Sequence, residues 1–362
     1  MRMRWIVVAA LVGLVITGVS PTQVAAAALP ADAPTTTPVA SRDDPHGDPK
    51  RLVVGYPTAD ASAKEGGRRG QAAAGCADPN TVTRYRGCKF VTGKVLTVAM
   101  TVPPVVLGVT WFNVTHHYQL SPNSRTIHER LDVRTTRSTA KTRLSLTAGC
   151  PAPCTATTKF PGGWMRTGKT LSGTITFHDT TPTQHAFEAS YRAVFSAPGT
   201  VPGLAEGISP RFRCDDLMPG QNAGCVFPDY IPTLTTLSGL RFVGPNIKKL
   251  QSQGAPTQLH RNSWLTDINR EQICGPAKLP PGWKPPAGWP KPLSDKLNQP
   301  SCDEYAFAST DEGGDKPGNG YGWVPLRENN AQGGLLQGFF RQNRVLDAAS
   351  IIQTGDPFNV TV

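Results

Sequence analysis

Ala186-Phe187-Glu188-Ala189-Ser190-Tyr191-Arg192-Ala193-Val194-Phe195 is a stretch in which apolar and polar residues alternate. Neighbouring side chains of a strand point to opposite faces, so this alternation predicts a β-strand with one buried face. Shorter runs rich in alternating or β-branched residues occur at 94–100, 143–147 and 174–177, and Pro and Gly clusters separate them. Short strands between frequent turns are typical of an antiparallel β-sandwich or barrel, which we predict for residues 76–235.

The residues before this region have a different character. Two arginines precede an apolar stretch over residues 5–19, and small residues at A-x-A spacing follow at 25–28. This order predicts a secretory signal peptide over residues 1–28 and a secreted, extracellular protein, with an uncleaved membrane anchor as the alternative. Residues 29–75 contain few large apolar side chains, which predicts a disordered linker or pro-segment.

The eight cysteines are an even number, and export makes disulfides more probable than metal binding. Neighbours in the sequence are the simplest partners. We therefore predict the disulfide pairs Cys76/Cys88, Cys150/Cys154, Cys214/Cys225 and Cys274/Cys302.

The C-terminal part of the chain is organised differently again. Residues 236–300 are expected to be irregular, because their many prolines lack the backbone donor that helices and sheets need. After them we predict a strand over 302–310, a Gly-rich loop over 311–321, a second strand over 322–327, a helix that begins near Asn329 and ends near Arg344, and a closing strand over 358–362.

The last hundred residues contain no histidine, so a base within them must be a carboxylate, a lysine or a tyrosine. All seven histidines precede residue 261, and the chain has no G-x-S-x-G, Walker A or H-E-x-x-H motif. Two acidic and polar clusters remain: Asp303 and Glu304 in C-D-E-Y-A-F-A-S-T-D-E-G-G (302–314), and Glu328, Asn329 and Asn330 in E-N-N-A-Q-G-G (328–334). Their oxygen donors suit a hard cation such as Mg²⁺, Mn²⁺ or Ca²⁺.

Two further points follow from the same residues. Adjacent residues of a strand face opposite sides, so Asp303 and Glu304 are expected to point apart unless a bulge intervenes. Taken alone, the two clusters also fit a charged strand edge followed by a helix N-cap.

The two motifs, in this order and spacing, resemble the NucA/NucB family of secreted bacterial deoxyribonucleases over roughly residues 262–362. The resemblance implies an α+β chain in which a small ββα-metal nuclease-like domain (236–362, motif core 302–343) follows the β-rich domain. It implies that Asp303 replaces the usual histidine as general base, with Glu304 as a nearby acidic site residue. Ala306 stands where family members often carry proline.

The resemblance also implies one divalent cation, with Mg²⁺ or Mn²⁺ preferred and Ca²⁺ as a further option. Asn329 is the metal-binding candidate, and Glu328 and Asn330 are second choices. Arg327 and Arg341 are candidates for binding the substrate phosphate.

We therefore expect a secreted, metal-dependent and largely sequence-nonspecific DNA endonuclease. One alternative is a noncatalytic cell-surface or wall-binding β protein with a degenerate C-terminal module. Another is an exported antibacterial toxin whose C-terminal residues act as the nuclease.

The net charge of +11 is unevenly distributed. Residues 76–262 contain 20 basic and 9 acidic side chains, whereas residues 263–362 contain 9 and 11. We expect the basic β-rich region to attract a polyanion, either DNA or an anionic cell wall, for a catalytic module that has no attractive field of its own.

Overall fold

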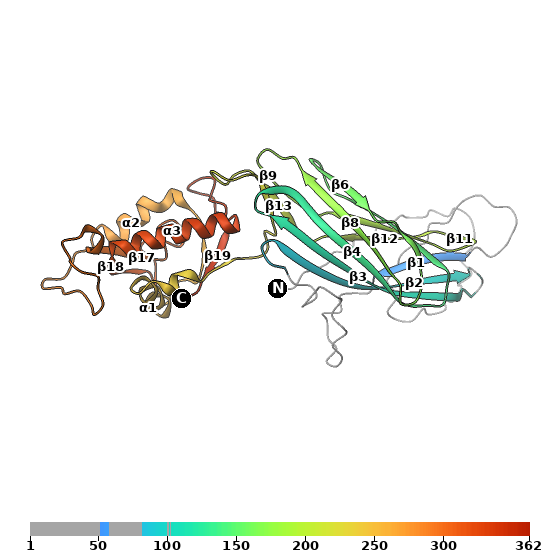
Figure 1. The fold of residues 1–362 in the computed structure, drawn as a ribbon, viewed down its shortest axis with the longest axis horizontal. Helices are drawn as coiled ribbons and strands as arrows, with labels where there is room; N and C mark the ends of the chain where they lie inside the picture. Colours follow the sequence, from blue (N-terminus) through green and yellow to red (C-terminus); the bar gives the residue numbers. More distant parts are fainter. Residues whose placement is uncertain (1–50, 58–81, 100, 102) are drawn as a thin grey trace, which may run out of the picture.

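The computed structural model describes residues 51–57, 82–99, 101 and 103–362. The predicted signal peptide (1–28) and Cys76 lie outside these residues. Two bodies of packed secondary structure lie end to end along the long axis of the molecule, one built of strands and one of helices and short strands (Figure 1). This β-rich chain with a few helices agrees with the predicted α+β class. Within the described ranges, no helix combines the length and the apolar character needed to cross a membrane.

The N-terminal body is built mainly from two sheets. A seven-stranded sheet has the order β11-β1-β2-β3-β4-β8-β6, and a four-stranded sheet has the order β12-β10-β5-β7. A three-stranded sheet, β14-β13-β9, completes this body. The strands are β1 (Arg51–Pro57), β2 (Arg86–Ala99), β3 (Val105–Ser121), β4 (Ser124–Ser138), β5 (Thr142–Gly149), β6 (Cys154–Lys159), β7 (Gly163–Met165), β8 (Thr170–Asp179), β9 (Gln184–Phe187), β10 (Ser190–Ser196), β11 (Thr200–Val201), β12 (Gly203–Ile208), β13 (Phe212–Asp215) and β14 (Gly224–Val226).

Alternation along the strands builds the core of this body. On β4, Ile127, Leu131 and Val133 are buried, while His128 and Arg130 are exposed between them. These apolar side chains join those of β8, β10 and β13 in one hydrophobic cluster. Burial of apolar area at about 25 cal/mol per Å² makes this cluster the main stabilising term of the sandwich.

One part of the expected linker, residues 29–75, has a different structure. Residues 51–57 form β1, which pairs antiparallel with β2 and parallel with β11. The run Leu52-Val53-Val54 has the β-branched character of a strand, and β2 provides the edge that it pairs with. The prediction of disorder was therefore wrong for these seven residues.

The C-terminal body surrounds a second hydrophobic cluster, between residues 234 and 360. Its elements are β15 (Thr233–Leu234), α1 (Val243–Ser252), β16 (Gln258–His260), α2 (Thr266–Cys274), β17 (Pro300–Tyr305), β18 (Gly320–Pro325), α3 (Leu326–Asn343) and β19 (Pro357–Val360), with short 3₁₀ helices at Thr236–Gly239, Ser263–Leu265 and Lys296–Asn298. β17 and β18 form an antiparallel hairpin, β15, β19 and β16 form a small sheet, and α3 follows β18 directly.

The expectation that residues 236–300 are irregular was wrong where α1 and α2 form. On α1, Val243, Ile247 and Leu250 recur at helical spacing and are all buried. Pro245 is tolerated because it lies in the first turn, where the missing N–H has no partner within the helix.

Three of the predicted disulfides are present among the described residues: Cys150–Cys154, Cys214–Cys225 and Cys274–Cys302. Cys88 is also disulfide-bonded. The Cys274–Cys302 bond ties the end of α2 to β17 beside Asp303.

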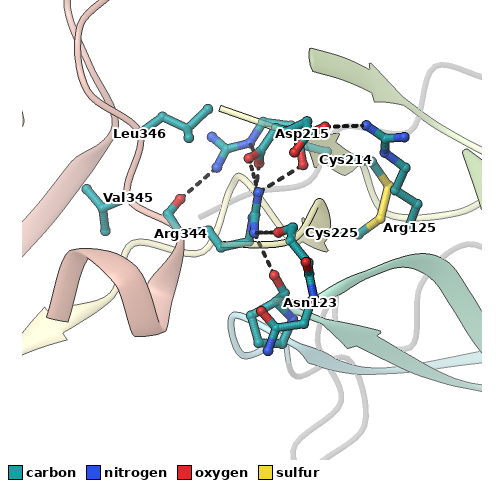
Figure 2. Close-up of polar contacts among 12 residues, drawn as sticks. Asn123, Arg125, Cys214, Asp215, Cys225, Arg344, Val345 and Leu346 are labelled. Carbon is teal, nitrogen blue, oxygen red and sulfur yellow. Dashed lines mark hydrogen bonds and ion pairs between the residues drawn. A yellow bond between two sulfur atoms is a disulfide. The ribbon is translucent and has the colours of Figure 1, made fainter. Parts of the chain in front are cut away.

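Charged groups buried at the junction join the two bodies. Arg344, fully buried after the last turn of α3, forms an ion pair with Asp215 of β13 and donates to the carbonyl oxygens of Pro122 and Asn222 (2.5 and 2.8 Å) (Figure 2). Arg213 binds Asp356 of the C-terminal body at 2.6 Å. These bonds connect the β3–β4 hairpin and β13 to the end of α3.

Candidate active site

The β17–β18 hairpin places both acidic motif residues at the centre of the C-terminal body. Asp303 is 2% exposed and Glu304 is 8% exposed. Asp303 contacts residues of α1 and α3, whereas Glu304 contacts α2. The two carboxyls therefore point to opposite sides of β17, as strand alternation predicts.

Asp303 is held by amide side chains from two helices. Asn246 of α1 donates through Nδ2 to both the side-chain Oδ2 and the backbone oxygen of Asp303, each at 2.9 Å. Gln332 of α3 also hydrogen-bonds the carboxyl. Burial raises the pKa of Asp303 from 3.8 to about 7, and these two amides oppose the rise. The carboxyl can therefore lose and accept a proton near neutral pH.

A glycine makes room for Asn246. Gly322 of β18 lies opposite Asp303 in the hairpin. A Cβ at Gly322 would lie 2.5 Å from Oδ1 of Asn246, which is closer than van der Waals contact permits. The Asn246 side chain thus crosses the hairpin over a position that only glycine leaves open.

Neither Asn246 nor Gln332 was among the sequence candidates. Asn246 is half-buried beside the apolar stripe of α1, and Gln332 lies among the buried residues of α3. A buried amide at such a position needs a hydrogen-bonding partner, so this pattern was the available signal.

Glu304 lies beside Arg270 and the disulfide. Nε of Arg270 is 3.4 Å from Oε1 of Glu304. Sulfurs of Cys274 and Cys302 lie within 4.8 Å of a Glu304 oxygen, a grouping that could suggest a metal site. Both sulfurs belong to the disulfide, however, and metal binding by cysteine requires a thiolate, so this group does not fit a cation.

The three metal candidates on α3 have different surroundings. Glu328 accepts through Oε2 from the backbone N–H of Phe242 (2.8 Å) and Val243 (3.3 Å), and thereby caps the start of α1. Asn329 donates through Nδ2 to Ser301 Oγ and the Cys302 backbone oxygen, both at 2.9 Å, which leaves its Oδ1 uninvolved in these two bonds. Asn330 is exposed.

The two arginine candidates lie on the surface. Arg327 pairs with Asp295 at 3.2 Å. Arg341 is in the last turn of α3, nine residues beyond Gln332, or about 14 Å along the helix axis. Their role in phosphate binding stays a prediction. Arg270, which was not among the sequence candidates, pairs with Glu304 of the acidic motif at 3.4 Å, and its side chain is 58% exposed.

The Gly-rich loop after β17 folds around a buried asparagine of α2. Nδ2 of Asn269 donates to the backbone oxygens of Ala308 (2.8 Å) and Thr310 (2.9 Å). A Cβ at Gly313 would lie 2.6 Å from that nitrogen, and Gly314 adopts a positive φ of 81°. The glycines therefore allow the loop to pack closely on α2 and keep it in place next to the acidic motif.

Comparisons with known proteins bear on this region. No curated protein matches the chain. Among solved structures, the GAE domain of GGA2p from Saccharomyces cerevisiae is 13% identical with a TM-score of 0.22, covering 27% of this chain and 89% of that domain. The yeast GGA1 GAE domain is also 13% identical, with a TM-score of 0.19 and coverage of 26% and 88%. TM-scores this low are no evidence of a shared fold.

A comparison with protein families matches the part of the chain that contains the site residues. Residues 270–361 match the family described as Deoxyribonuclease NucA/NucB, and this range includes Asp303, Glu304 and Asn329. Nothing in these matches supports the expected binding to an anionic cell wall. The family resemblance expected from the two motifs is therefore confirmed: the C-terminal part of this chain matches the deoxyribonuclease NucA/NucB family.

Proposed function

We propose that this chain is a secreted, metal-dependent endonuclease that hydrolyses DNA with little dependence on sequence. The proposal rests on the position and the pKa of Asp303. It lies within the family match, and its burial brings its pKa to about 7, near the value at which a general base is most effective at neutral pH. The three disulfides of the described chain are consistent with an extracellular protein.

Asp303 acts as the general base in this proposal. Its carboxylate accepts a proton from a water molecule, whose oxygen attacks phosphorus in line with the departing 3′-oxygen. Asn246 and Gln332 fix the carboxyl so that no rotamer search precedes the proton transfer. General-base catalysis of this kind contributes about 10²–10⁴-fold to a rate.

The oxygen donors at the start of α3 fit a hard cation. Asn329 has Oδ1 available because Nδ2 makes both of its hydrogen bonds, and Glu328 has one carboxylate oxygen beyond the one that caps α1. We propose that Asn329, with Glu328, holds Mg²⁺, Mn²⁺ or Ca²⁺. When bound, the cation supplies Lewis-acid stabilisation of the phosphate and leaving-group charge, worth several kcal/mol. The hydrogen bonds to Ser301 and to the Cys302 backbone would hold the Asn329 side chain in one orientation.

Plasmid digestion tests the proposal. Supercoiled DNA should become nicked and linear with Mg²⁺ or Mn²⁺, and excess EDTA should stop the reaction. Asn329→Ala should raise the cation concentration needed for half-maximal rate at least tenfold, whereas Asn330→Ala should change it less than twofold. Cleavage that persists in EDTA would contradict metal dependence, and absence of cleavage with every cation would contradict the function.

A further inference from the structure

The outward-facing side of the seven-stranded sheet is unusually basic. We call the outward positions of β2, β3, β4, β8 and β6 the outer face; buried residues alternate with them and point into the sandwich. The outer face carries Arg86, Lys94, Arg130, Arg134 and Lys159, together with three histidines. Asp132 is the one carboxylate at these outward positions of the described strands.

That carboxylate is already neutralised. Nε of Arg130 lies 3.1 Å from Oδ2 of Asp132, and Nε2 of His117 lies 3.9 Å from the same oxygen. The exposed guanidinium groups of Arg86 and Arg134 and the ammonium group of Lys159 form no ion pair with the carboxylates of the described residues. Their positive charge is therefore available to an external anion.

Strand register arranges these groups in rows. His117, Arg130, Thr174 and Lys159 lie opposite one another on β3, β4, β8 and β6, in one row across the sheet. Neighbouring strands are about 4.8 Å apart, so the row is about 14 Å long.

The adjacent row contains Arg86, Gln119, His128 and Thr176. An open groove of about 610 Å³ runs along both rows, and Arg86, His128 and Arg130 are among the residues that line it. The strands that carry the groove, β3 and β4, extend toward the C-terminal body (Figure 1).

The opposite side of the sandwich has no such surplus. Its four-stranded sheet exposes Arg143 on β5 and Arg192 on β10, and Arg192 lies opposite Glu206 of β12. The outer face therefore carries more positive charge than the four-stranded sheet on the opposite side.

We propose that the outer face binds the phosphate backbone of DNA and holds the substrate of the nuclease body. The identity of the polyanion rests on the proposed function. Arginine and lysine release counterions when they neutralise phosphates, and threonine hydroxyls and arginine donate to phosphate oxygens. A groove lined by such groups recognises the charge of the DNA backbone and not the base sequence, which suits an enzyme with little sequence preference.

Equilibrium binding of DNA, measured without cleavage, tests this proposal independently of catalysis. The full-length protein is titrated in EDTA against a fluorescent 30-base-pair duplex, and anisotropy is measured between 50 and 200 mM salt. The test variant is Arg86→Gln/Arg134→Gln/Lys159→Gln. The matched control, Lys141→Gln/Arg143→Gln/Arg192→Gln, removes the same charge from exposed residues elsewhere on the sandwich. Thermal unfolding of each variant confirms that it is folded.

The test variant should bind at least tenfold more weakly at 100 mM salt. The slope of log affinity against log salt should fall by up to about three, because each lost phosphate contact contributes about 0.9. The control should lose less than threefold. Equal losses in both triple variants, or no DNA binding by the unmodified protein, would overturn the proposal. Unmodified protein that binds DNA with the expected slope but cleaves none would overturn the proposed function and leave the binding face supported.

Discussion

The buried carboxyl of Asp303 should make the protein less stable as the pH rises toward neutrality. Its pKa is about 7 in the folded chain, against an ordinary 3.8, because burial disfavours the charged form. The unfolded chain releases this proton near pH 4, whereas the folded chain keeps it until about pH 7. Between these values the folded state binds more protons, so the free energy of unfolding falls as the pH rises. At about 1.4 kcal/mol per pH unit, the loss in free energy of unfolding reaches about 4 kcal/mol above pH 7.

Asp303→Asn removes this titration and keeps an oxygen that can accept from Asn246. The variant should gain stability relative to wild type as the pH rises, and the gain should grow by roughly 3 kcal/mol between pH 5 and pH 8. Urea unfolding at both pH values, in EDTA so that no cation favours the carboxylate, measures this difference. Asp267→Asn, an exposed site on α2, is the matched control and should show no such gain. If the free energies of unfolding of wild type and Asp303→Asn change by the same amount between pH 5 and pH 8, burial does not raise the pKa of Asp303.

Three other substitutions test how the site and the junction are held. Asn246→Ala removes the hydrogen bond to the Asp303 carboxyl, which lowers the pKa of that carboxyl, and a second bond to the Asp303 backbone oxygen. We therefore expect kcat/KM to fall about tenfold and the low-pH limb of its pH profile to move to higher pH; an unmoved limb would contradict this role. Gly322→Ala should reproduce that phenotype in the same assay by displacing Asn246, and wild-type kinetics would show that the space is not needed. Arg344→Met removes the closer of the two arginines that pair with the buried Asp215, the other being Arg213 at 3.3 Å, and should cost about 3–5 kcal/mol in urea unfolding, whereas a loss below 1 kcal/mol would mean that the pair is not part of the cooperative fold.

Local patterns predicted the elements that depend on local chemistry. The alternating run at 186–195 forms parts of β9 and β10, with Phe187, Tyr191 and Phe195 buried. The predicted order of strand, Gly-rich loop, strand and helix is the order of β17, the loop, β18 and α3, but β17 ends at Tyr305 and not at residue 310, and α3 already begins at Leu326. Period and turn residues were sufficient there, because each element shows its buried face in its own sequence.

Contacts between distant segments could not be predicted in the same way. Glu328 looked like a metal ligand beside Asn329, but one of its oxygens caps α1, whose first residues precede it by more than 80 positions. Asn246 reaches Asp303 only because α1 packs across the β17–β18 hairpin and Gly322 leaves the space. A polar residue beside the apolar stripe of α1 indicates that Asn246 needs a partner, but neither segment indicates that the partner is Asp303.

The rate of plasmid cleavage by Asp303→Asn, measured with saturating Mg²⁺ or Mn²⁺ on protein shown to be folded, tests the assignment of the general base directly. Asp303→Asn keeps the shape and the hydrogen bond from Asn246 but cannot accept the proton. We predict a rate lower than wild type by about 10²–10⁴-fold, with Asp267→Asn unchanged. A rate within threefold of wild type would show that Asp303 is not the base.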